Sequence, residues 1–189
     1  FIYSGEELRR RQFLAGMNIE DLELILHPMI EDMKEAVGSM GDDTPTAVLS
    51  DKYRPLSHFF RQNFSQVTNP PIDSLRENKV MSLKTRFGNL GNILDFNNLT
   101  QENIYVLNSP ILTNNQFEKF VSFFDKNNKT IDCTFNSDEN IESKLNSIKQ
   151  EAEIYVRQGV TQIILSDKNV SKENYPVPML LCIGAVHTH

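Results

Sequence analysis

Apolar residues recur with two different periods in the second half of the chain, and the two periods alternate. Residues 104–107 are apolar throughout, apolar side chains alternate over 130–135, and 160–165 form another apolar run, which predicts three strands. Between them, 114–124 and 137–157 carry apolar residues at intervals of three and four, which predicts two helices. Strands and helices that alternate at this spacing favour β-α-β units and a parallel sheet.

The first half of the chain reads as helices and loops. We expect a helix over 4–15 and a longer one over 19–35, where Pro28 kinks or splits the helix because it lacks an N–H group. A further helix is expected to begin at Pro55, and 80–87 is expected to be a strand.

These patterns predict an α/β fold of parallel β-α-β units with an N-terminal helical part. Its 189 residues suit one domain, with a helical and loop-rich part over 1–103 and a β-α-β part over 104–189. Residue 1 is Phe, and the apolar run 179–186 has no stop signal after it, so we expect a fragment of a longer chain.

Composition and charge narrow the possible partners. Hydrophobic residues make up 39% and charged residues 23%, and the net charge is −6, with no basic stripe to neutralise phosphates. We therefore expect no nucleic-acid partner. We also expect no membrane span, since no apolar run approaches the roughly 20 residues that one needs. Cys133 and Cys182, the two cysteines, are expected to be buried reduced thiols in a cytoplasmic protein.

Two loops stand out for their stiff or permissive backbone. In Gly38-Ser39-Met40-Gly41, the glycines allow a sharp turn and a close approach to another surface, although a tight loop capped by Asp42 and Asp43 also fits the pattern. In Thr68-Asn69-Pro70-Pro71, the prolines fix the backbone and would hold small polar groups rigidly, although a plain loop also fits.

Two further groups could carry chemistry. His187 and His189 would share a face on a strand and could ligate a metal, but not on a helix, and no third ligand is near in sequence. Residues 166–168, Ser-Asp-Lys, follow a predicted strand at the end where α/β folds bind ligands, or they form an ordinary loop with a helix cap. The residues alone therefore point to an α/β domain without a visible active site, and a free-standing binding module for a small anionic ligand stays open.

Eight segments, in order along the chain, resemble the central domain of the glutamate synthase large subunit. The two long ones are the most specific: Glu35-Ala-Val-Gly-Ser-Met-Gly-Asp-Asp-Thr-Pro45 and Gln66-Val-Thr-Asn-Pro-Pro-Ile-Asp73. The shorter ones are 21–26, 47–51, 80–83, 109–112, 164–167 and 184–187.

The resemblance implies a connecting domain shaped like a degenerate, incomplete copy of a flavin β/α barrel. In that family an N-terminal glutaminase domain releases ammonia from glutamine, and a tunnel carries it to a C-terminal FMN domain. There the ammonia adds to 2-oxoglutarate, and electrons arrive through an iron–sulfur cluster from a small electron-donor subunit or from ferredoxin. The resemblance implies no catalytic, cofactor-binding or metal-binding residue in this segment, which is therefore expected to be inactive when isolated.

The resemblance also suggests which residues border the ammonia tunnel or a domain interface. They are Gly38, Ser39, Met40, Gly41, Thr68, Asn69, Pro70 and Pro71.

Overall fold

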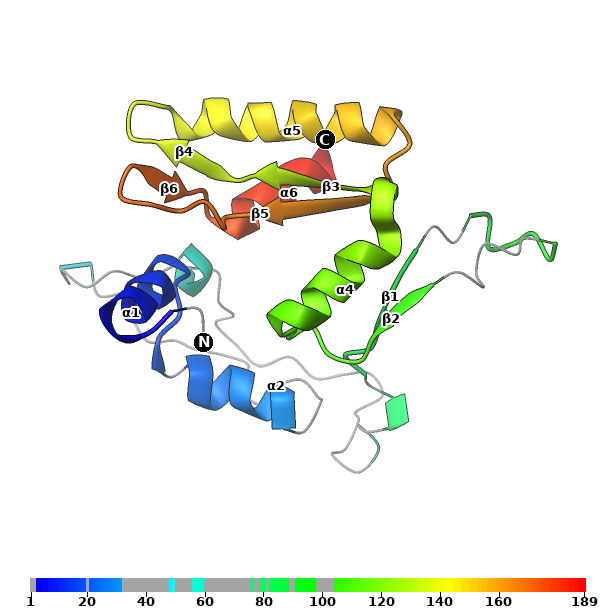
Figure 1. Cartoon of the computed structure of the whole chain (residues 1–189), viewed down its shortest axis with the longest axis horizontal. Helices are drawn as coiled ribbons and strands as arrows, with labels where there is room; N and C mark the ends of the chain where they lie inside the picture. Colours follow the sequence, from blue (N-terminus) through cyan, green and yellow to red (C-terminus); the bar gives the residue numbers. More distant parts are fainter. Residues whose placement is uncertain are drawn as a thin grey trace. The chain divides into compact units, whose positions relative to one another are not determined.

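A computed structural model describes much of the chain (Figure 1). The described residues are 3–19, 21–31, 48–49, 56–59, 76, 79–80, 82–88, 91–97 and 104–189. They fall into two compact units, Phe1–Thr85 with Leu107–Ile111, and Arg86–Val106 with Leu112–His189.

The first unit contains the predicted N-terminal helices. Helix α1 spans Gly5–Leu14, as expected, with an ion pair of 2.8 Å between Glu7 and Arg11 one turn apart. The chain leaves α1 through Gly16, whose φ of 70° favours glycine. A short 3-10 helix, η2, covers Leu56–Phe59, close to the predicted start at Pro55.

The second predicted helix changes from a π-helix to an α-helix just before Pro28. Its start is capped by a reciprocal pair of hydrogen bonds, in which the backbone N–H groups of Asn18 and Asp21 each donate to the other's side chain over 2.9 Å. A π-helix, η1, follows over Asp21–Leu26, and α2 covers His27–Glu31. Pro28 lacks an N–H and crowds the carbonyl four residues earlier, so a locally widened helix relieves the clash.

A small aromatic group occupies the start of the second unit. Strands β1 (Thr85–Phe87) and β2 (Tyr105–Leu107) pair, and helix α4 (Asn114–Phe124) has the predicted bounds. The ring of Phe120 lies 4.9 Å from Phe87 and 5.4 Å from Tyr105, centroid to centroid. Phe124 is also buried, but Phe117, which the stripe pattern places inward, is 42% exposed. Of the strand expected over 80–87, the described residues form a strand only over 85–87; residue 80 is helical, and 82–84 have no regular structure.

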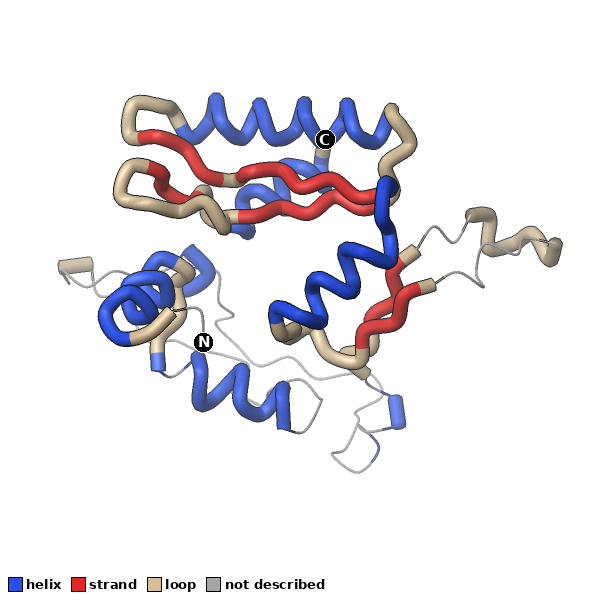
Figure 2. Tube along the Cα trace, in the orientation of Figure 1, coloured by secondary structure: helices blue, strands red, loops and turns tan. Residues whose placement is uncertain are grey.

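One parallel β-α-β unit forms the main layer, and Figures 1 and 2 show its long helix lying along two strands. Strand β3 (Asn128–Asp132) pairs in parallel with β5 (Gln162–Ser166), in a register from Asn128↔Gln162 to Asp132↔Ser166. The crossover is helix α5 (Ile141–Arg157). Gly159, with φ of 85°, ends the turn after it.

The predicted strand over 130–135 proves to be two strands. After β3, the chain passes through Cys133 into β4 (Thr134–Asn136), which pairs antiparallel with β6 (Asn174–Pro176). Helix α5 is capped by Asn140, whose Oδ1 accepts from the Glu142 N–H at 2.8 Å, so it does not begin at residue 137, where the pattern predicts its start. Residues before Asn140 instead form a turn, in which the Glu139 N–H donates to the Asn136 carbonyl.

The core lies between these strands, α5 and the last helix, α6 (Met179–Thr188). Its buried members are Ile131, Cys133, Ile148, Ala152, Val177 and Cys182. Because β3 and β5 pair in register, Ile131 and Leu165 lie side by side and cover the same face.

The described strands form three two-stranded sheets and no closed barrel. Strand β2 pairs with β1 and not with β3, so the described strands do not form one parallel sheet that includes β2. No helix in the described part is long and apolar enough to cross a bilayer.

Candidate functional site

The carboxyl edge of the parallel pair is held by one carboxylate. Asp132, the last residue of β3, accepts hydrogen bonds at Oδ1 from the Thr134 backbone N–H (2.9 Å) and hydroxyl (2.8 Å). Its Oδ2 accepts from Asn169 Nδ2 at 2.7 Å. Burial raises the pKa of Asp132, but the hydrogen bonds from Asn169 and Thr134 outweigh it, so the pKa lies below its usual value. Oδ1 thus holds the turn from β3 into β4, and Oδ2 joins β3 to the loop after β5.

Ser166, Asp167 and Lys168 form a turn at this edge. The Ser166 carbonyl accepts from the Cys133 N–H at 2.8 Å, and its hydroxyl accepts from the Lys168 N–H at 3.2 Å. The Asp167 carbonyl accepts from the Val170 N–H at 3.0 Å. These contacts form an ordinary loop, and they favour that interpretation of residues 166–168 over a ligand-binding site.

The two cysteines are buried free thiols, which confirms the sequence prediction. They contact each other within the core, and this contact together with burial raises the pKa of Cys182. A protonated buried thiol is a poor nucleophile and a poor metal ligand.

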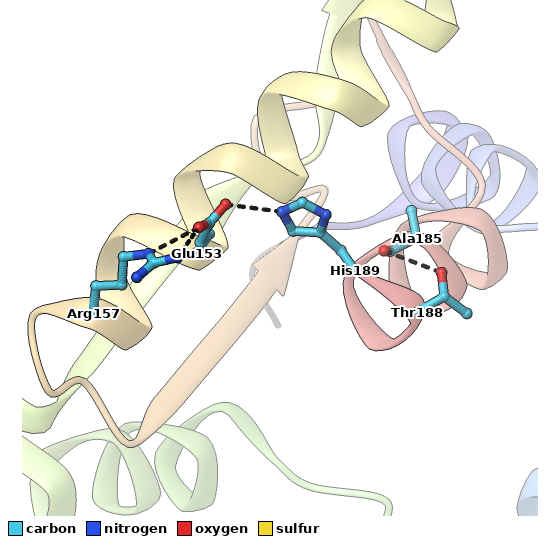
Figure 3. A network of polar contacts seen from close by, with 5 residues as sticks. All are labelled: Glu153, Arg157, Ala185, Thr188 and His189. Atoms are coloured by element: carbon cyan, nitrogen blue, oxygen red, sulfur yellow. Dashed lines mark hydrogen bonds and ion pairs between the residues drawn. The ribbon is translucent and has the colours of Figure 1, made fainter.

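Three ionisable side chains link the end of α5 to the end of α6 (Figure 3). Arg157 lies 2.6 Å from Glu153 Oε1, and His189 Nε2 lies 3.0 Å from Glu153 Oε2. The hydrogen bond from Arg157, and then that from His189, lower the pKa of Glu153. The pairing of Glu153 with Arg157 can be predicted from the sequence, because the two residues lie four apart in one helix. The contact between Glu153 and His189 depends on tertiary packing.

These three side chains border an open cavity of about 460 Å³. The rest of its lining is apolar: Ala152, Val156, Ile163 and Val186. Most of the cavity wall is therefore apolar. The charged side chains at its edge are already paired, Glu153 with both Arg157 and His189.

The two C-terminal histidines do not form the pair that a strand would have given. His187 lies in α6 and His189 follows its end, so they do not share a face as they would on a strand. Within the described ranges, no three His, Cys, Asp or Glu side chains gather as a metal site.

The residues that the sequence singles out for a tunnel or interface lie outside those that the structure describes. This holds for Gly38, Ser39, Met40 and Gly41, and equally for Thr68, Asn69, Pro70 and Pro71.

Comparison with known families places the chain. The family model described as "Glutamate synthase central domain" matches residues 10–189. The chain belongs to the glutamate synthase central domain family. The resemblance noted in the sequence is thereby confirmed, over nearly the whole chain.

Curated relatives of this family member are glutamate synthases. It is 57% identical over 186 residues to "Glutamate synthase [NADPH] large chain" of Azospirillum brasilense, which covers 97% of this chain and 12% of the relative. It is 40% identical to the protein of the same name in Bacillus subtilis, over 97% of this chain and 12% of that one. It is 37% identical to "Ferredoxin-dependent glutamate synthase 2, chloroplastic" of Arabidopsis thaliana, over 100% of this chain and 12% of that one. The chain thus spans about an eighth of the length of these relatives, whose names give different electron donors.

Proposed function

We propose that this chain is the connecting domain of a glutamate synthase and carries no chemistry of its own. In this proposal it joins the glutaminase domain to the FMN domain and borders the tunnel through which ammonia passes. The complete enzyme forms glutamate from glutamine and 2-oxoglutarate. The observation that carries the proposal is the family match over residues 10–189, together with 57% identity to a glutamate synthase large chain.

The tunnel role rests on two loops, 38–41 with a backbone made permissive by glycine and 68–71 with a backbone stiffened by proline. A path for ammonia has to exclude water while admitting a small polar molecule, so its wall needs fixed backbone and few full charges. Glycine at 38 and 41 permits close approach of the backbone, and proline at 70 and 71 restricts it. Between them, Ser39, Met40, Thr68 and Asn69 would present small polar or soft apolar groups.

The cofactors of the complete enzyme belong, in this proposal, to its other segments. FMN and an iron–sulfur cluster would supply its redox chemistry. This chain contributes the scaffold that sets the distance between the glutaminase and FMN domains, and its two buried cysteines serve its own core. A small electron-donor subunit or ferredoxin would be the external partner of the complete enzyme.

We propose that the fold is an incomplete β/α barrel related to the flavin barrel. Support comes from the parallel register of β3 and β5 and the covering helix α5, because a strand, a helix and a parallel strand are the repeating unit of such barrels. We propose that further strands of the complete chain extend this unit.

The test is ammonia transfer in the complete large chain. Thr68→Leu puts an apolar branched side chain where the tunnel wall is proposed, and Ser147→Leu on the exposed side of α5 is the matched control. Glutamine hydrolysis and 2-oxoglutarate consumption are measured together, with free ammonia. We expect Thr68→Leu to release ammonia to solvent and to consume more glutamine per 2-oxoglutarate, while the control keeps the two in step. Equal coupling in both variants would argue against the tunnel role.

A free-standing binding module is separated from this proposal by calorimetry on the 189-residue chain. FMN, 2-oxoglutarate, glutamine and phosphate are titrated in turn. Micromolar binding of any of them would favour the module, and heats no larger than dilution would favour the connecting domain.

A further inference from the structure

Helix α6 is apolar on both of its sides. One side packs into the core through Cys182, which is fully buried, with Met179 and Val186 against the same cluster. Away from this side, Leu180 is 52% exposed, and Ile183, at the edge of the exposed side, is 54% exposed. A helix that is hydrophobic all round is normally buried on all sides, since a surface helix has one polar face. The exposed side of α6 therefore has the apolar composition of a surface that another segment covers.

A glycine lies in the middle of this exposed side. Gly184 has no positive φ that would call for glycine, and a Cβ added there would meet nothing within 4 Å among the described residues. Glycine inside a helix costs roughly 1 kcal/mol relative to alanine. Neither the local backbone nor the packing of the described residues explains that cost. A close approach by another backbone would explain it.

The neighbours of Gly184 make the surface suitable for such an approach. Leu180, Gly184 and Thr188 lie four residues apart and form one row along the helix. The Thr188 hydroxyl donates to the Gly184 carbonyl at 2.8 Å and needs no outside partner. The row thus has no side chain at its centre, at Gly184, and an apolar side chain at one end, at Leu180. His187, exposed beside it, adds a polar edge.

We propose that the outward face of α6, made of Leu180, Leu181, Ile183 and Gly184, is the docking surface for an α-helix from another part of the large chain. The proposal rests on the proposed function, because the partner is the rest of that enzyme. The relatives are large chains of which this sequence covers only 12%, so ample chain exists to supply the helix. A helix fits the surface because its ridge of side chains enters the gap that a glycine leaves in the row. The two backbones then approach closely at Gly184.

The first test measures access to the surface in the complete large chain. Ile183→Cys is labelled with a maleimide, and tandem mass spectrometry assigns the label to position 183. Ser147→Cys, on the exposed side of α5, is the control. We expect position 183 to react about tenfold more slowly or slower still, because a covered thiol reacts only when the surface opens. Equal rates at the two positions would overturn the proposal.

Dilution separates a helix of the same chain from a second copy of it. Protection that is unchanged on dilution supports the proposal, whereas protection that is lost on dilution identifies a contact between copies and overturns it. If Ile183→Cys does not fold, Leu180→Cys is used in the same way, with the same reading. Labelling requires no turnover, so its outcome is independent of whether Thr68→Leu uncouples ammonia transfer.

Gly184→Ala gives a second measurement on the complete chain. The added methyl raises helix propensity, so an uncovered surface predicts a higher melting midpoint, like that of the control Ser147→Ala. A closely packed partner helix predicts the opposite sign, because the methyl enters the contact. A midpoint lowered for Gly184→Ala alone supports the proposal, and one raised in both variants contradicts it.

Discussion

The hydrogen bond between Asn169 and Asp132 offers the sharpest test of how the carboxyl edge is held. Asn169→Ala removes the 2.7 Å contact that joins the loop after β5 to the end of β3, and leaves the two contacts from Thr134 in place. A hydrogen bond to a charged group is worth about 1.5–3 kcal/mol. Asn169 is exposed, so water replaces part of the contact, and we expect a loss of about 1 kcal/mol at pH 7. That loss lowers the ratio of folded to unfolded chain about fivefold.

The pH dependence of this loss identifies its origin. The carboxyl pKa of Asp132 is lower in the folded chain than its ordinary value of 3.8, so ionisation stabilises the fold above pH 3.8. As the pH falls through the lowered pKa, the carboxylate is protonated and that stabilisation disappears. The difference between the original chain and Asn169→Ala should therefore shrink at acid pH.

Urea unfolding followed by circular dichroism at pH 7 and near pH 3 measures both effects. Lys168→Ala, at the adjacent exposed position, serves as the control and should change the free energy of unfolding little at either pH. Our reasoning would be refuted if Asn169→Ala cost nothing at pH 7. It would also be refuted if the cost were the same at both pH values, because the contact would then not depend on the charge of Asp132.

Three further substitutions test other parts of the second unit by the same urea measurement. Ile148→Ala should cost about 2–5 kcal/mol because its side chain is 1% exposed and its removal leaves a cavity against Ile131; a cost below that of an exposed substitution would contradict the assignment of the core. Thr113→Ala should cost about 1 kcal/mol, since Thr113 and Gln116 form the capping box of α4, and the far-ultraviolet helix signal should weaken with it. Gly159→Ala should cost about 1 kcal/mol through its backbone alone, because its φ is 85° and no atom lies within 4 Å of the added methyl among described residues; an increase in stability would show that the backbone there has another conformation.

Local chemistry decides which elements could be predicted from the sequence. Helix α4 is predicted with its observed bounds from its apolar stripe, and the capping box of Thr113 and Gln116 in the structure fixes the same start. Helix α5 is predicted with the right end but a start four residues early. Ser137 and Asn140 are both good N-caps, and pairing of β4 with β6 decides between them by drawing Asn136 into a strand.

Long-range contacts could not be predicted from the pattern of apolar and polar residues. The break at Cys133 divides one alternating stretch between a parallel and an antiparallel partner, and alternation reports which face is buried but not which strand lies alongside. The link between Asp132 and Asn169 likewise depends on β3 and β5 being neighbours. The family, by contrast, could be recognised from the ordered short motifs, because motif order survives where tertiary contacts are not readable.

The backbone of Cys133 has a consequence for where this chain can be shortened. Its N–H donates to Ser166 and its carbonyl accepts from the Val177 N–H at 2.9 Å, so a single interior residue is tied to two distant later segments. A truncated protein ending just after Ser166 would keep the parallel strands and the long helix. It would leave that carbonyl without its donor, and the apolar interior without Val177 and Cys182. An expression boundary on the C-terminal side should therefore fall beyond α6, and nascent chains should acquire a protease-resistant interior only after that helix has left the ribosome.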